Sequence, residues 1–417
     1  MKRAKTTFMK RGISILLSLT MLALLLPARS VLAETVEDSA AQKEESYRQI
    51  IIRDVPECTW TSDTEISHTT ELCDPEGNVN GYIYEYANDG EPAGYLQLDL
   101  SMDGPVLDCY CFGGEHPAAK EIRELPTTVS ENSGKEKVLY LGGYSYFLLG
   151  EENGKGLTEA YDVMNHNQAL IDCGKAAEMY QADVSAKEQA FAQQTAVPNS
   201  TMSAQSANTI TKLVPSFGGL TLATYTNMST DYYGCGAICG TNICMYWSKC
   251  RGKTNLFTTS QAVYNNLKGK MDIQQIGLGG GTNGPKAYNG LKAYVSEKGY
   301  STSAATYLGS GYSWNWIVSA INAGHPVIQS AYYSETTQYI NGKVIYVKDE
   351  QGNYHEDHHF VAVFGYQYID VVNTLIIADC YSSSTVYKAY AILTSQRGLD
   401  GSTPIAIPYQ PVAFYVV

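Results

Sequence analysis

A cysteine at the point where a loop becomes a helix is the first candidate for chemistry in this chain. Cys235 stands between Gly234 and Gly236, and an apolar run follows it as far as Trp247. The N–H groups and the positive dipole end of a helix start favour a thiolate and lower a cysteine pKa from its ordinary value of about 8.5. A small buried core residue is the alternative interpretation of a single cysteine. The position therefore predicts a nucleophile if the chain also supplies a base.

Histidines in the second half of the chain are the candidates for that base. A nucleophilic thiol needs a group that takes its proton, and that group needs a third one to hold its ring. His325 lies between a glycine and a proline, which is typical of a structural or surface position, whereas His355, His358 and His359 precede an apolar strand. His359 is the one that enters the strand, so we predict that it is the base.

A hairpin could supply the third group. Residues 360–368 and 374–378 are apolar runs that can pair as antiparallel strands, with the turn near Ile369-Asp370. In that register His359 faces Asp379, with Cβ atoms about 4.5–5.5 Å apart, so the carboxylate could bond the imidazole N–H. A slip of one residue would remove the match, and a turn residue that ends a strand is the alternative interpretation of Asp379.

Metal and nucleotide chemistry are the competing interpretations of this half. Cys235 and Cys250 stand at the two ends of the set of four helix cysteines, and their separation of fifteen positions spans about 22 Å of helix, too far for one ion. Gly279, Gly281 and Gly284 have the spacing of a dinucleotide fingerprint, but no good strand precedes them and no paired acidic residue follows. We therefore expect no metal and no cofactor, and a flexible loop at the glycines.

Helices precede strands in the second half. The pattern predicts helices at Thr259–Lys270, Pro285–Gly299 and Trp314–Ala323, and short apolar runs from there to the carboxy terminus. This order favours an α+β domain in which helices pack on a sheet.

The first half reads as a smaller α+β domain. A charged helical segment to about Arg53 precedes short alternating strands at 82–86, 95–100 and 138–141, which are typical of a sheet with one wet face. Helical character returns from Lys175 to about Gln193. His116 and His166 have no nucleophile or ligand cluster near them in the sequence, so we expect both at the surface.

Targeting and linker signals divide the chain into four segments. Residues 1–33 have the basic start, apolar run and small-residue cleavage pattern of a signal peptide. We assign 34–193 to the amino-terminal α+β domain, 194–212 to a protease-sensitive linker and 213–417 to the second domain. Residues 1–33 contain six positive side chains and no acidic one, so the net charge of −13 becomes −19 after cleavage. This charge argues against nucleic acid or an anionic membrane as a partner, and no later segment predicts a membrane anchor.

Four sequence blocks, followed by an aspartate, resemble the papain-fold cysteine peptidases related to bacteriocin double-glycine peptidases. The blocks, in chain order, are Tyr233-Gly234-Cys235-Gly236 with Tyr246-Trp247, Trp316-Ile317, Gly324-His325-Pro326-Val327 and His359-Phe360-Val361-Ala362-Val363-Phe364-Gly365-Tyr366, and the aspartate is Asp379. The resemblance covers roughly residues 213–417. It implies a papain-like fold, with Cys235 as nucleophile, His359 as general base and acid, and Asp379 as the orienting carboxylate.

Two positions depart from that family. Ala237 stands where proline is frequent, and Ser229 stands where the family often has a glutamine that binds the oxyanion. The backbone N–H of Cys235 can serve as one donor, and Asn227 or Ser229 are candidates for the second. Relatives that process bacteriocins are joined to transporters and face the cytosol, so a double-glycine leader is not the substrate we expect here.

These features together predict a secreted bacterial cysteine peptidase that cleaves a peptide or protein substrate. Position and linker composition predict that residues 34–193 are a propeptide that aids folding or covers the cleft in a self-inhibited precursor. Two alternatives stay open: an acyltransferase of transglutaminase-like chemistry that uses the same triad, and a non-catalytic papain-fold binding or adhesion module.

Overall fold

The computed structural model describes most of the chain. The described residues are 35–125, 137–153, 157–164, 166–196, 209–228, 234–276, 279–282, 284–306, 314–333, 337–340, 343–346, 357–394 and 412–417. The chain divides into two compact units, residues 1–42 and 43–417; of the first, only the start of helix α2 is described. The predicted signal peptide, 1–33, lies outside the described residues. Among those described, no helix has the length and apolar character that crossing a bilayer requires.

The first half contains three helices and eight strands among its described residues. The helices are α2 (Val36–Asp54), α3 (Pro117–Glu124) and α5 (Cys173–Ala196). The strands are β1 (Glu65–Cys73), β2 (Val79–Asn88), β3 (Glu91–Asp99), β4 (Val106–Phe112), β5 (Val138–Tyr140), β6 (Tyr146–Asn153), β7 (Leu157–Asp162) and β8 (Asn167–Ile171). The two predicted helices and the three predicted strands are therefore confirmed.

The prediction of one wet face for these strands is wrong. Nearly every residue in the centre of β2 and β3 is buried. On one face of β2 the Tyr86 hydroxyl donates to Glu44 of α2 at 2.5 Å, and on the other Glu85 forms an ion pair with Arg123 of α3. Because helices cover both faces, the strands do not need the alternation of a sheet that is half exposed to water.

The second half contains the helices α6 to α10 and the strands β9 to β19. The helices are α6 (Cys235–Lys249), the short 3₁₀ helix η1 (Thr254–Leu256), α7 (Ser260–Lys270), α8 (Gly284–Glu297), α9 (Trp314–Asn322) and α10 (Tyr390–Thr394). The strands are β9 (Ile210–Leu213), β10 (Gln274–Ile276), β11 (Gly279–Gly281), β12 (Thr302–Thr306), β13 (Val327–Tyr333), β14 (Thr337–Ile340), β15 (Lys343–Tyr346), β16 (Asp357–Ile369), β17 (Val372–Ala378), β18 (Val386–Ala389) and β19 (Val412–Val416). The predicted helices are confirmed, whereas two of the glycines expected in a loop lie in β11, which pairs with β10.

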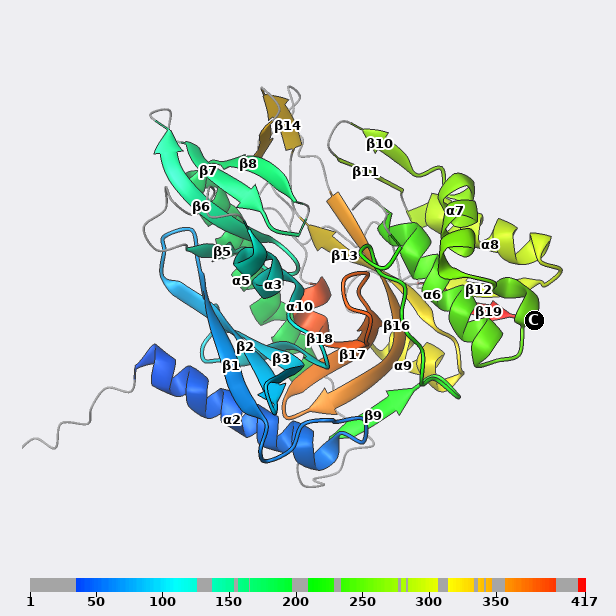
Figure 1. Cartoon of the computed structure of the whole chain (residues 1–417), viewed down its shortest axis with the longest axis horizontal. Helices are drawn as coiled ribbons and strands as arrows, with labels where there is room; N and C mark the ends of the chain where they lie inside the picture. The colour runs from blue at the N-terminus through cyan, green and yellow to red at the C-terminus, as the bar shows by residue number, and fades with distance from the viewer. Residues whose placement is uncertain are drawn as a thin grey trace, which may run out of the picture. The chain divides into compact units, whose positions relative to one another are not determined.

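Strand β16 is the centre of the part of the sheet that matters for function. It pairs with β17 along one edge, and with β13 and β9 along the other. Strand β17 pairs with β18, which in turn pairs with β4 of the first half. Figure 1 shows β16, β17 and β18 side by side. All described strands except β10 and β11, which form a separate pair, thus belong to one sheet that continues on both sides of the predicted linker, and the domain boundary itself stays a prediction.

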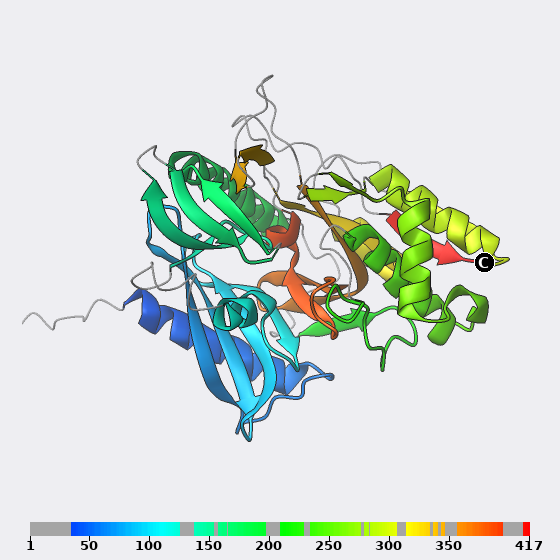
Figure 2. The same ribbon diagram turned by 45° about the horizontal axis from the view of Figure 1, so that its top comes forward.

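Helix α6 packs on β16 and is buried over most of its length. Every residue from Cys235 to Trp247 is buried, as the apolar run predicts. Both views show α6 beside β16, and in Figure 2 the green and yellow-green helices α7 and α8 lie with it. Because the helix has neighbours around most of its circumference, its apolar side chains are removed from water on every face. This hydrophobic burial is the main force that holds the helix on the sheet.

A buried ion pair joins the two halves where β18 meets β4. Lys388 of β18 pairs with Asp108 of β4, and both side chains are fully buried. Asp108 also accepts hydrogen bonds from the Tyr140 hydroxyl at 2.5 Å and from Gln97 Nε2 at 2.8 Å, while Lys388 Nζ donates to the carbonyl oxygen of Gly143 at 3.2 Å. Removal of one partner from such a pair leaves an uncompensated buried charge, which costs about 3–5 kcal/mol.

Candidate active site

Cys235 is the first residue of α6, as the sequence predicts, and it is 5% exposed. Both neighbouring glycines lie at close contacts: a Cβ atom on Gly234 would collide with the Tyr264 hydroxyl, and one on Gly236 would lie 2.6 Å from Thr282 Cγ2. Gly234 is the N-cap residue and has no side chain with which to cap the helix. The first-turn N–H groups are therefore not occupied by an N-cap side chain, and the helix dipole favours negative charge at this position.

His359 lies in β16 and is 2% exposed. Its Nε2 atom is 2.8 Å from the main-chain oxygen of Asp379. A carbonyl oxygen only accepts hydrogen bonds, so Nε2 carries the proton and Nδ1 keeps its lone pair. Burial lowers the pKa of His359 to about 4, against the opposing effect of the Asp379 hydrogen bond. The ring is therefore neutral at pH 7, with Nδ1 as the basic atom.

The predicted hairpin forms, but the predicted register is wrong. Ile369 pairs with Val372 and Ala362 pairs with Ala378, so the turn is the dipeptide after Ile369 and the pairs are shifted by two residues. Asp379 lies beyond the last pair and is not opposite His359. The two residues still meet because the chain bends after β17 and brings the Asp379 carbonyl group to the imidazole.

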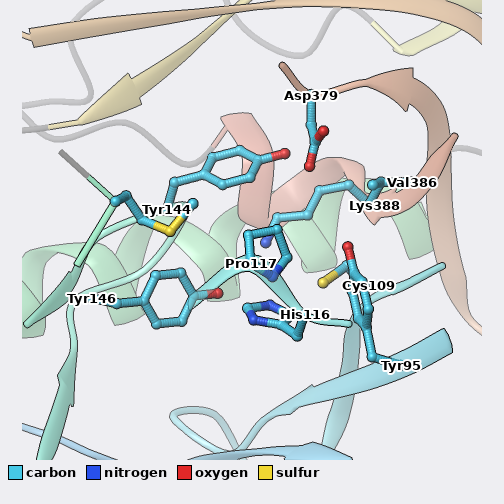
Figure 3. A pocket seen from close by; sticks show the side chains of 10 residues that line it. Tyr95, Cys109, His116, Pro117, Tyr144, Tyr146, Asp379, Val386 and Lys388 are labelled. Carbon is cyan, nitrogen blue, oxygen red and sulfur yellow. The ribbon is translucent and has the colours of Figure 1, made fainter. Parts of the chain in front are cut away.

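The side chain of Asp379 accepts hydrogen bonds within its own turn. Its Oδ1 atom accepts hydrogen bonds from the N–H groups of Tyr381 at 3.0 Å and Ser382 at 2.8 Å. The contact that holds His359 is therefore made by the main-chain oxygen of residue 379, whereas the sequence led us to expect the carboxylate. Figure 3 shows the carboxylate pointing into a small pocket. Burial raises the pKa of Asp379 to about 6, although the two N–H donors and Lys388 lower it.

Cys380 connects the three segments of the site. Its Sγ atom lies 3.7 Å from the carbonyl oxygen of Cys235 and 3.5 Å from that of Phe360, the residue after His359. Cys380 is fully buried and has φ of +71°, which is uncommon for a residue with a side chain. One buried thiol in the turn after β17 thus contacts both the start of α6 and strand β16.

Tyrosine rings cover His359. The ring of Tyr381 stacks on the imidazole at a centroid distance of 5.2 Å, and that of Tyr144 lies on it at 5.1 Å. Tyr225 packs on Tyr381 at 5.2 Å. Tyr144 comes from the turn between β5 and β6, so the first half contributes directly to the cover. Sequence reasoning missed these residues; the one available signal was the excess of tyrosine, 33 residues against 9 phenylalanines.

The segment before α6 is fixed to the helix and to the turn after β17. The Asn242 side chain accepts a hydrogen bond from the N–H of Ala223 at 2.8 Å and donates one to its carbonyl oxygen at 3.1 Å. The N–H of Tyr225 donates to the carbonyl oxygen of Cys380 at 2.9 Å. These bonds fix residues 223 and 225 to α6 and to the turn after β17.

The predicted candidates for a second oxyanion donor are Asn227 and Ser229, and the structure describes Asn227. The Asn227 side chain accepts from the N–H of Thr224 at 2.9 Å and donates to the carbonyl oxygen of Leu222 at 2.8 Å, so its amide stabilises its own turn. Ser229 lies outside the described residues.

The pocket in Figure 3 lies between the turn of Asp379 and the first half of the chain. Its lining residues are Tyr95, Cys109, His116, Pro117, Tyr144, Tyr146, Met164, Asp379, Val386 and Lys388. His116 is 4% exposed, so the prediction that it lies at the surface is wrong; its Nδ1 atom caps α3 by accepting from the N–H of Ala119 at 3.4 Å. Burial lowers the pKa of His116 to about 3, which keeps it neutral.

His325, another histidine of the second half, stands apart from this arrangement. His325 follows α9, is half-buried and lies 4.8 Å from the ring of Tyr415. His355 and the side chain of His358 lie outside the described residues. Within the part of the chain that the structure describes, no three His, Cys, Asp or Glu side chains are grouped so that they could hold a metal ion.

Comparison with known proteins points to the same part of the chain. Residues 220–397 match the model of the Peptidase_C39 like family, and this span contains Cys235, His359 and Asp379. One matching solved structure comes from Bacillus anthracis, and its title assigns it provisionally as a C39-like peptidase; it is 13% identical, with 49% of this chain and 97% of that chain covered at a TM-score of 0.29. No curated protein matches the sequence.

Proposed function

We propose that this protein is a cysteine peptidase in which Cys235 is the nucleophile and His359 the general base. The observation that carries the proposal is the 2.8 Å contact between His359 Nε2 and the main-chain oxygen of Asp379. It supports a proton on Nε2 and Nδ1 as the base, while Cys380 contacts both the Cys235 and Phe360 carbonyl groups. The match of residues 220–397 to a peptidase family supports the same chemistry.

The reaction follows from these assignments. Nδ1 of His359 takes the proton of the Cys235 thiol, and the thiolate attacks the carbonyl carbon of a peptide bond. The tetrahedral intermediate collapses to a thioester while the imidazolium gives its proton to the leaving amine. Water, deprotonated by the same Nδ1, then hydrolyses the thioester and regenerates the thiol. Asp379 orients His359 through its carbonyl oxygen.

The precursor part of the proposal rests on the cover over His359. Tyr144, from the first half, lies on the imidazole, and both Cys235 and His359 are buried. Burial disfavours the imidazolium that the reaction must form, which is the physical meaning of the lowered pKa of His359. Displacement of Tyr144 would let water reach the ring, raise this pKa toward its ordinary value and admit substrate.

Secretion and processing complete the proposal. The signal-peptide pattern of residues 1–33 supports export, and the composition of 194–208 supports a cleavable linker. Strand β18 pairs with β4 and the Lys388–Asp108 ion pair lies at the same place, so a cut in the linker leaves the two halves bound to each other. Activation then consists of movement of the Tyr144 turn rather than loss of the whole first half.

Two variants of the full mature chain test the activity. Cys235→Ala removes the proposed nucleophile, and Cys239→Ala removes a buried thiol one helical turn further on as a matched control. We expect self-cleavage and hydrolysis of a fluorogenic peptide library in the wild type and in Cys239→Ala, and neither in Cys235→Ala. Equal behaviour of all three proteins contradicts the proposal. Incorporation of an amine into a peptide ester faster than its hydrolysis would instead identify an acyltransferase.

A further inference from the structure

Asn242 lies on the same face of α6 as Cys235. It is the seventh residue after the cysteine, which is almost two helical turns, so both side chains leave the helix in nearly the same direction, about 10.5 Å apart along its axis. Asn242 is fully buried. A primary amide in such a position needs hydrogen-bond partners, because burial of a polar group without them is unfavourable.

The Asn242 amide bonds both main-chain groups of Ala223. Its Oδ1 atom accepts from the N–H at 2.8 Å, and its Nδ2 atom donates to the carbonyl oxygen at 3.1 Å. A residue of a neighbouring antiparallel strand would exchange the same two bonds. The flipped amide would set donor against donor and acceptor against acceptor, so the orientation of the side chain is fixed. Helix α6 thus holds Ala223 through one side chain.

The segment around Ala223 is bonded in turn to the turn after β17. The N–H of Leu222 donates to the carbonyl oxygen of Ser383 at 2.9 Å. The N–H of Tyr225 donates to the carbonyl oxygen of Cys380, also at 2.9 Å. These two bonds lie on either side of Ala223 in the sequence. A shift of the segment relative to α6 would therefore move the turn as well.

The turn after β17 orients the proposed base, because the main-chain oxygen of Asp379 lies 2.8 Å from Nε2 of His359. We propose that Asn242 is a positioning residue, which fixes this turn relative to α6 and so sets the place of His359 relative to Cys235. The inference rests on the proposed peptidase function, in which His359 takes the proton of the thiol. A misplacement of about 1 Å far from the reacting atoms can lower a rate by about 10²-fold. No proton moves to or from Asn242.

Asn242→Leu in the full mature chain is the test, because leucine has a similar size and can make neither bond to Ala223. The matched control is Thr241→Val, which changes the preceding residue; Thr241 is also fully buried, and its hydroxyl donates within α6 to the carbonyl oxygen of Ala237 at 2.7 Å. We expect Asn242→Leu to lower kcat by about 10- to 100-fold with KM within about threefold, while Thr241→Val keeps both.

Circular dichroism shows whether each variant is folded. If the leucine variant does not fold, Asn242→Ala replaces it, because the smaller side chain leaves room for water to bond Ala223. Unchanged kcat in the folded variant, or an equal fall in Thr241→Val, overturns the proposal.

Alkylation separates this inference from the proposed function. Iodoacetamide reacts with the thiolate, which a nearby imidazolium stabilises, so displacement of His359 should move the pH midpoint for Cys235 alkylation upward in the Asn242 variant and leave it in place in Thr241→Val. Mass spectrometry of the peptide that contains Cys235 follows the reaction. A residue that only stabilises the fold would leave the midpoint of the folded variant unchanged, and that result rejects the positioning role. An upward shift in a chain that hydrolyses no peptide would reject the peptidase and keep Asn242 as the residue that positions His359.

Discussion

Replacement of Asp379 with asparagine distinguishes two ways of orienting His359. The imidazole Nε2 contacts the main-chain oxygen of residue 379, which asparagine retains. The Oδ1 atom of asparagine can also accept from the N–H groups of Tyr381 and Ser382, so the substitution removes only the charge on these two hydrogen bonds. We expect kcat/KM to fall by about tenfold or less, which corresponds to about 1.4 kcal/mol.

The alternative, a carboxylate that bonds the ring directly, predicts a much larger effect. An asparagine in that position stabilises the wrong imidazole tautomer, and the corresponding change in a serine protease lowers kcat by about 10⁴. Asp379→Ala lies between the two: it loses both hydrogen bonds, at about 1 kcal/mol each, and should cost about 30-fold.

Steady-state hydrolysis of one fluorogenic peptide by the wild type, Asp379→Asn and Asp379→Ala decides between these cases, with circular dichroism to show that each variant is folded. A loss of about 10⁴ in folded Asp379→Asn would refute orientation by the carbonyl oxygen. A smaller loss in Asp379→Ala than in Asp379→Asn would refute it as well.

Three further measurements test other parts of the structure. Tyr144→Ala should make the unprocessed chain several-fold more active on a small peptide because it opens the cover on His359, whereas Tyr144→Phe should not; an alanine variant no more active than wild type contradicts a covering role. Lys388→Met should lower the free energy of unfolding by about 3–5 kcal/mol in urea titrations because Asp108 is left buried and unpaired, and a loss below 1 kcal/mol would show that the pair does not hold the halves together. Asp379 has a pKa of about 6 in the folded state against an ordinary 3.8, so as pH rises the unfolded chain loses this proton at a lower pH than the folded protein does. The contribution of this group to the free energy of unfolding therefore falls as pH rises from about 4 to 6 and is then constant. At about 1.4 kcal/mol per pKa unit, Asp379→Asn should gain up to about 3 kcal/mol over the wild type at pH 7.5 and little at pH 4, and an equal difference at both pH values would be evidence against it.

Local patterns in the sequence predicted the elements that carry the site. The apolar run after Cys235 and the two flanking glycines are sufficient to predict a buried helix that starts at the cysteine, because helix periodicity and glycine punctuation are properties of neighbouring residues. The hairpin of β16 and β17 was equally visible. Its register was not, because the choice of turn depends on Asp370 adopting φ of +53°, and no Asn-Gly or similar signal marks that position.

Contacts between distant segments could not be predicted. Tyr144 meets His359 because strands of the two halves pair, β4 with β18 and β8 with β15, and nothing near either residue in the sequence encodes these pairings. For the same reason His116 was expected at the surface, although its ring lies against those of Tyr95 from β3 and Tyr146 from β6. Tyr225 was overlooked because a tyrosine before a helix is an ordinary core residue until its ring is found packed on Tyr381, which stacks on His359.

The pairing of β4 with β18 also has a consequence for the way the chain folds. Strand β4 ends at Phe112, whereas its partner begins at Val386, so synthesis delivers the first half long before the strand that completes its edge. During that interval β4 presents an unpaired edge, which is a template for association with other chains. Contacts this far apart in sequence also form slowly. Refolding should therefore be slow and sensitive to protein concentration, and a chain that ends before β18 should aggregate.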